Sequence, residues 1–87
     1  MKITEGFILR KVANESVVMP IGVASAKLNG IIKLNASGVM LWNLLKDGAE
    51  KADLADALAK EYGIELLQAE KDVEAFLAPL VKIGCVE

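Results

Sequence analysis

The chain has 87 residues, which is the size of one domain with a modest hydrophobic core. Ten basic and twelve acidic residues give a net charge of −2, and Arg10 and Lys11 form the one adjacent basic pair, which disfavours a nucleic-acid binder that relies on clustered positive charge. No apolar run approaches the ~20 residues of a membrane span, and a single cysteine, Cys85, is typical of a reducing, cytoplasmic setting.

The groups that most often carry catalysis or bind metal ions are missing from the sequence. There is no histidine, which is the commonest general base and metal ligand, and no glycine-rich phosphate-binding motif. Acidic pairs such as Asp53 and Asp56 stand at helical spacing and are expected on solvated helix faces. We therefore expect a protein that is not an enzyme and that uses neither a cofactor nor a metal ion.

The first two predicted elements are strands. Residues 7–12 and 16–21 are rich in β-branched and aromatic residues, and the polar residues between them include Asn14, which tolerates positive φ. This pattern predicts a hairpin with a loop of three to five residues. Pro20 has no N–H to donate, so it is expected at a strand end or a sheet edge. Residues 22–29 show no strong periodicity and are interpreted as a connection.

The segment of residues 30–45 predicts a strand that leads directly into a helix. Residues 31–34 form the expected strand, in which Ile32 and Leu34 share one face because strand side chains alternate. Asn35 is a favourable helix N-cap. The residues that follow at helical spacing predict an apolar stripe with the only tryptophan in the core: Gly38, Leu41, Trp42 and Leu45.

Two further helices are predicted after Gly48. One covers residues 51–62, with Leu54, Leu58 and Tyr62 on one face, and ends at Gly63. The other begins near Leu66 and ends at Gly84. Its apolar stripe consists of Ala69, Val73, Phe76, Leu77, Leu80 and Ile83. Pro79 removes one hydrogen bond of this helix and is expected to bend it or to end its regular part.

The order of the elements predicts an α+β fold, with a three-stranded antiparallel sheet followed by a three-helix bundle. The helices are expected to pack against one face of the sheet, all within a single domain of residues 1–87. A three-stranded sheet has two open edges, whose free backbone groups can pair with an extended peptide. From the residues alone, binding of such a peptide is the function that remains once catalysis is disfavoured.

The ordered set of hydrophobic, glycine and asparagine positions is similar to a known family. The motif Leu34-Asn35 is followed by Gly38 and Leu41-Trp42, and later by Asp72-Val73 and Phe76-Leu77, with flanking matches that begin at Gly6-Phe7 and end at Gly84. This pattern resembles the PqqD family of pyrroloquinoline quinone (PQQ) biosynthesis, whose fold recurs as the RiPP recognition element of peptide-modifying systems. The chain departs from the pattern at Glu50 and Glu65, where Ser, Thr or Asp often caps the last two helices.

The resemblance implies a winged-helix-like fold and a function as a non-catalytic peptide chaperone. Such a protein binds the leader of a ribosomally made precursor peptide and presents the peptide to a modifying enzyme, often a radical S-adenosylmethionine (SAM) protein. In the family the leader adds as a strand along strand 3 and lies against the last helix. Carried over by position, the edge consists of Gly30, Ile31, Ile32, Lys33 and Leu34. The groove wall consists of Asp72, Ala75, Phe76 and Pro79. A proline at Ile32 is then expected to delete a donor of the edge ladder and to abolish binding.

Two other functions remain open at this point. A winged-helix DNA-binding regulator would share the architecture, although the predicted helices lack a basic face. An orphan adaptor that docks another enzyme, such as a transferase or a kinase-like protein, would also share it. We expect no nucleic-acid or membrane partner, and a monomer, with a weak or hairpin-swapped dimer as the alternative.

Overall fold

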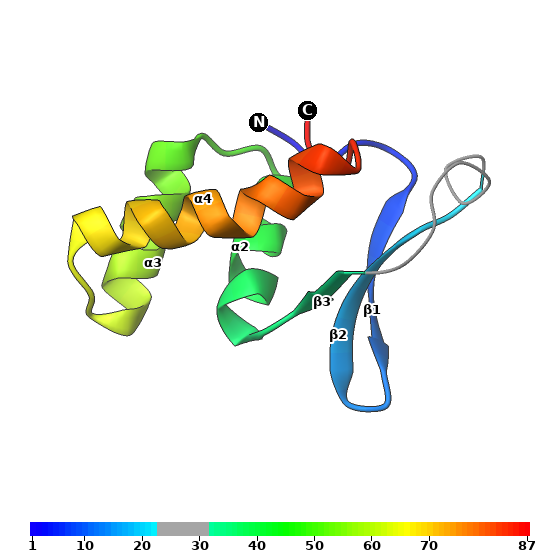
Figure 1. Cartoon of the computed structure of the whole chain (residues 1–87), viewed down its shortest axis with the longest axis horizontal. Helices are drawn as coiled ribbons and strands as arrows, with labels where there is room; N and C mark the ends of the chain where they lie inside the picture. The colour runs from blue at the N-terminus through cyan, green and yellow to red at the C-terminus, as the bar shows by residue number, and fades with distance from the viewer. Residues whose placement is uncertain (23–31) are drawn as a thin grey trace.

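The computed structural model describes residues 1–22 and 32–87, which form a three-stranded antiparallel sheet followed by three helices (Figure 1). The strands β1 (Phe7–Val12), β2 (Glu15–Pro20) and β3 (Ile32–Leu34) lie in the order β1-β2-β3. The helices are α2 (Ala36–Lys46), α3 (Lys51–Tyr62) and α4 (Leu66–Lys82). The expected α+β fold class is confirmed. The predictions for Gly30 and Ile31 lie outside the described residues.

The β1–β2 hairpin has a tighter turn than the sequence predicted. Val12 pairs with Glu15, so the loop contains only Ala13 and Asn14, and the expected length of three to five residues is wrong. Both loop residues adopt the left-handed conformation, with φ values of 51° and 68°. Two consecutive left-handed residues match the right-handed twist of a hairpin. As a result β2 begins at Glu15, one residue before the predicted start.

The junction between β3 and α2 follows the prediction and places the helix directly against the strand. The Asn35 side-chain oxygen Oδ1 accepts hydrogen bonds from the Gly38 backbone N–H and from the Ser37 hydroxyl, both at 2.9 Å. Gly38 lies so close to β3 that a Cβ atom at this position would be 3.2 Å from the Cβ of Leu34. The glycine therefore lets β3 and the first turn of α2 approach each other.

The core consists of two clusters that meet along α2 and α4. The helical cluster contains the buried apolar residues of all three helices: Leu41, Leu45, Leu54, Ala55, Leu58, Ala69, Val73 and Leu77. The second cluster joins the sheet to α2, α4 and the C-terminal segment through Val18, Trp42, Leu80 and Cys85. Trp42 is 2 % exposed, which confirms its expected place in the core. The buried residues of α3 all belong to the helical cluster, so α2 and α4 cover the sheet.

The helix α4 continues to Lys82, three residues past Pro79, so the proline does not end it. Proline has no N–H, and the carbonyl of Ala75, four residues earlier, therefore lacks its usual helical donor.

The C-terminal segment that follows α4 pairs with the N-terminal segment, with Lys2 and Glu87 exchanging two backbone hydrogen bonds of 2.9 Å. Figure 1 shows the two chain ends side by side above α4.

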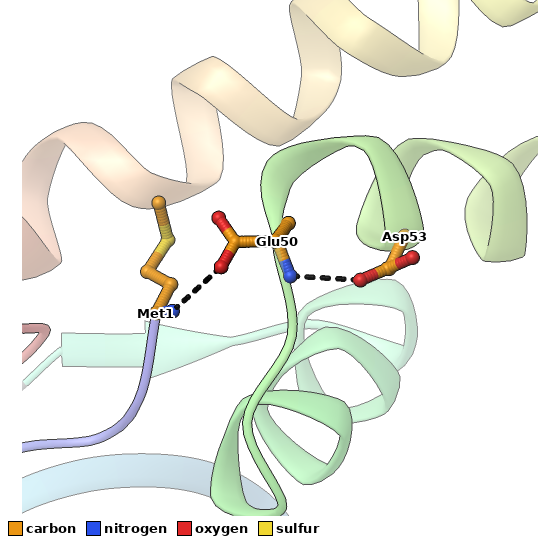
Figure 2. Close-up of polar contacts among 3 residues, drawn as sticks. All are labelled: Met1, Glu50 and Asp53. Atoms are coloured by element: carbon orange, nitrogen blue, oxygen red, sulfur yellow. Dashed lines mark hydrogen bonds and ion pairs between the residues drawn. The ribbon is translucent and has the colours of Figure 1, made fainter.

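Contacts at Glu50 hold the N-terminal segment against the start of α3 (Figure 2). The N-terminal ammonium of Met1 lies 3.4 Å from the Glu50 carboxylate, and the Met1 carbonyl accepts a 2.9 Å hydrogen bond from the N–H of Ala49. The Glu50 N–H donates to the carboxylate of Asp53 at 2.9 Å. Asp53 thus satisfies one backbone donor at a helix start where the sequence lacks the favoured capping residues.

Candidate functional site

A hollow of about 590 Å³ lies between the end strand of the sheet and the last helix. Its strand side consists of Ile32, Lys33 and Leu34, and its helix side consists of Asp72, Ala75, Phe76 and Pro79. This volume falls in the range of pockets that bury small ligands or several side chains. We call this hollow the β3–α4 groove. Seven of the nine site residues predicted from the sequence line it, and the other two, Gly30 and Ile31, lie outside the described residues.

The floor and walls of the β3–α4 groove are mostly apolar. Ile32 and Leu34 point to the helix side of the sheet and pack against the cluster that contains Trp42. Phe76 is half-buried and packs against both clusters of the core while it also lines the groove. The sequence places Phe76 both in the apolar stripe of the last helix and in the predicted groove wall, and the structure brings the two placements together. Its contacts with the core hold one wall of the groove in place.

The hydrogen-bond pattern of the hairpin shows which backbone groups of β2 face β1. In an antiparallel ladder, pairs that exchange both backbone hydrogen bonds alternate with pairs that exchange none. The N–H of Ile21 donates to the carbonyl of Gly6 at 2.8 Å, which marks that pair as hydrogen-bonded. Arg10 and Val17 lie four residues away along each strand and belong to the same class. The backbone groups of Val17 therefore point to β1.

The neighbours of Val17 consequently direct their backbone groups to β3. These neighbours are Ser16, whose partner is Leu34, and Val18, whose partner is Ile32. The N–H and C=O groups of Ile32 and Leu34 thus face β2, inside the protein's own sheet. Those of Lys33 face the opposite way, to the side of β3 where no strand of the described residues pairs. A proline at Ile32 would remove a backbone donor that faces β2 and would disrupt the sheet itself. The expectation that this substitution deletes a donor of the open edge is therefore wrong.

Two charged side chains of the described residues line the groove, and only one of them has an ion-pair partner within that part of the chain. The Lys33 ammonium lies 3.2 Å from the Glu15 carboxylate across the sheet, so its charge already has a partner. One oxygen of Asp72 accepts a 2.9 Å hydrogen bond from the neutral amide of Gln68. Within residues 1–22 and 32–87, no ion pair involves Asp72. The groove therefore carries one uncompensated negative charge.

Sequence reasoning missed several further residues that line the groove. They come from the start of α2 and from the end of α3 and its connection to α4: Asn35, Ser37, Gly38, Leu41, Leu58, Tyr62 and Ile64. Tyr62, which the sequence places on one face of α3 with Leu54 and Leu58, is 47 % exposed. A large aromatic side chain at the last position of a helix, next to Gly63, is a signal that could have identified a surface role.

The described residues contain no group of three or more His, Cys, Asp or Glu side chains that could hold a metal ion. None of the helices in residues 1–22 and 32–87 has both the length and the apolar character needed to cross a bilayer. The features that stand out in this part of the chain are thus a strand edge and the groove beside it.

Comparison with known proteins connects this geometry to a family. The family model for coenzyme PQQ synthesis protein D (PqqD) matches residues 15–86. Among solved structures, the chain is similar to TbiB1 in complex with the TbiA(beta) leader peptide, with a TM-score of 0.78 and 25 % identity over 100 % of this chain and 95 % of that chain. It also shares the fold of lasso peptide synthetase B1 complexed with the leader peptide, with a TM-score of 0.75 and 23 % identity over 97 % of this chain and 93 % of that chain.

Among curated proteins, none matches the chain at a significant level. The PqqD model nevertheless spans most of the sequence, including β2, β3 and all three helices. The resemblance that the sequence motifs indicated is therefore confirmed, and this chain belongs to the PqqD family.

Proposed function

We propose that this chain binds the leader segment of a ribosomally made precursor peptide as an added strand along β3. The observation that carries the proposal is the coincidence of the open side of β3 with a 590 Å³ apolar groove against α4. Backbone pairing supplies affinity that tolerates many sequences, and the groove selects side chains. The similar protein TbiB1, which was solved with a leader peptide, supports this assignment.

The bound chain would pair with the N–H and C=O groups of Lys33 and place alternate side chains in the β3–α4 groove. Successive strand residues point to opposite faces, so every second side chain of the guest would lie between Phe76 and the Ile32–Leu34 face of β3. A flexible leader loses conformational entropy when it orders on the protein, which limits the net affinity. We expect dissociation constants of about 1 μM, equivalent to about −8 kcal/mol.

The role that follows is that of a chaperone without catalytic groups of its own. In this role the protein would hold the leader while a separate enzyme, such as a radical SAM protein, modifies the remainder of the precursor. The absence of histidine from the sequence and the apolar lining of the groove favour binding over chemistry. An adaptor that docks a different class of modifying enzyme would use the same groove.

The first test removes the edge donor. Isothermal titration would use synthetic peptides that cover the N-terminal halves of short reading frames beside the gene. Lys33→Pro deletes the outward N–H at a position where an edge strand tolerates proline. Lys33→Ala also loses the ion pair to Glu15 but keeps the N–H, so it is the matched control. We expect binding to be lost in Lys33→Pro and retained in Lys33→Ala, with both variants folded by circular dichroism. Equal affinity in the two variants would contradict strand addition.

The second test fills the groove without touching the sheet. Ala75 and Ala78 are both exposed on α4, but only Ala75 lines the groove. Ala75→Trp should weaken peptide binding at least tenfold, because the indole occupies space that the guest side chains need, whereas Ala78→Trp should leave binding unchanged. Equal effects of the two substitutions would place the peptide elsewhere on the protein.

A further inference from the structure

The one polar side chain that the described part of α4 presents to the β3–α4 groove is the Asp72 carboxylate, a hydrogen-bond acceptor. The Asp72 carboxylate has one oxygen engaged by the Gln68 amide, and a carboxylate offers about four acceptor positions in total. Asp72, Ala75 and Pro79 all line the groove. This wall can therefore accept further hydrogen bonds at the Asp72 carboxylate.

Among the lining residues that the structure describes, the one other charged side chain is that of Lys33, and it does not neutralise this wall. Its ammonium is paired with Glu15, at 3.2 Å, on the hairpin side of β3. Within the described part of the chain Asp72 has no cationic partner. A guest side chain that brings several donors and a positive charge would complement this wall, and a lysine or arginine side chain has both properties.

The spacing along α4 fixes where that charge must lie relative to an apolar side chain. Asp72 and Phe76 are four residues apart, or about 6 Å along the helix axis. Side chains on one face of a strand repeat about every 6.6 Å, which is the distance between alternate residues. One guest residue can therefore reach Asp72 while the residue two positions away packs against Phe76. In the view of Figure 1, β3 and α4 run in opposite directions. A guest strand antiparallel to β3 would therefore run in the direction of α4, and its cationic residue would precede the apolar residue in the guest's sequence.

We infer that the groove selects peptides with a lysine or arginine two residues from an aliphatic or aromatic residue, through the Asp72 carboxylate and the face of Phe76. This inference rests on the proposed function, because it describes the guest strand of the same groove. It assigns Asp72 as the residue that determines specificity for the cation, rather than as one more solvated acid of α4.

The test is a selection from a displayed library of random twelve-residue peptides, carried out on the wild-type protein and on Asp72→Asn in parallel. The amide keeps the shape of the carboxylate and an oxygen for Gln68, but it removes the charge. When the peptides enriched on the wild type are aligned, one position should hold Lys or Arg, and the position two residues away should hold an apolar residue. We call these positions the Lys/Arg column and the apolar column. The Lys/Arg column should disappear in the selection on Asp72→Asn, while the apolar column should remain.

A double-mutant cycle then measures the contact directly. One enriched peptide and its Lys→Gln or Arg→Gln counterpart are titrated against both proteins. On the wild type, loss of the peptide cation should weaken binding about three- to tenfold, with a smaller effect at 0.5 M salt. On Asp72→Asn the two peptides should bind equally. A Lys/Arg column that persists on Asp72→Asn, or no such column on the wild type, would overturn this inference and leave strand addition intact.

The same selection separates the failure of this inference from failure of the proposed function. Enriched peptides should lose binding to Lys33→Pro and keep it to Lys33→Ala. If no enriched peptide shows this dependence on the Lys33 N–H, the proposed strand addition is wrong, and the assignment of Asp72 is wrong with it.

Discussion

Replacement of Gly38 by alanine should destabilise the protein, although alanine is normally favoured over glycine in a helix. The added Cβ would lie 3.2 Å from the Leu34 Cβ and 3.3 Å from the Asn35 Oδ1 that caps α2. The Leu34 Cβ is attached directly to the backbone of β3, so no side-chain rotation can relieve the contact. The methyl group must instead push the strand away from the helix.

The expected change in the free energy of unfolding is the difference between two opposing contributions. Alanine gains about 1 kcal/mol over glycine in a helix interior, and less in the first turn. Overpacking at a rigid contact costs about 1–3 kcal/mol. We therefore expect a net loss of about 1 kcal/mol in the free energy of unfolding. For a chain of this size, this loss lowers the urea midpoint by about 1 M.

The assay is equilibrium urea unfolding followed by the fluorescence of Trp42, which is buried beside this junction. The matched control is Asn43→Ala, an exposed position in the same helix, which should gain about 0.5 kcal/mol from helix propensity alone. Because Leu34 also lines the groove, Gly38→Ala should weaken peptide binding as well. A Gly38→Ala protein that is more stable than the wild type would refute the reasoning that close contact between β3 and α2 requires glycine.

Three further predictions concern the cap, the core and the buried thiol. Asn35→Ala removes the acceptor of the Gly38 N–H and should lower the free energy of unfolding in urea by about 1 kcal/mol. An unchanged urea midpoint would contradict the role of Asn35 as a stabilising helix cap. Leu80→Ala leaves a cavity at a fully buried site and should cost about 2–5 kcal/mol, whereas a loss below about 1 kcal/mol would contradict its close packing. Burial raises the pKa of the Cys85 thiol from 9.0 to about 11, so the folded protein keeps a proton that the unfolded chain releases. The contribution of the protonated thiol to stability should therefore be fully present below pH 9.0 and should fall by at most about 3 kcal/mol as the pH rises to about 11. Cys85→Ala should flatten this decline in urea titrations at several pH values, and an equal decline in both proteins would exclude the thiol as its cause.

The local patterns of the sequence were sufficient to predict the elements and the family. The bounds of α3 match the prediction at both ends, because an apolar stripe and a following glycine are properties of neighbouring residues. Asn35 and Gly38 likewise specify the turn from β3 into α2 through contacts within three residues. The seven described positions carried over from the family lie in one groove, and their role in peptide binding stays a prediction.

The tertiary structure alone decided which backbone groups are available at the edge. Whether Ile32 or Lys33 points outward depends on two things: which backbone groups of β2 the hairpin with its two-residue turn at Ala13 and Asn14 leaves free for β3, and how β3 is registered against β2. A shift of one residue would exchange the two roles, so no property of residues 32–34 by themselves could reveal them. The place of Tyr62 in the groove likewise depends on the tertiary structure, since the side chain of a helix end lines the groove only once α3 has packed against α4.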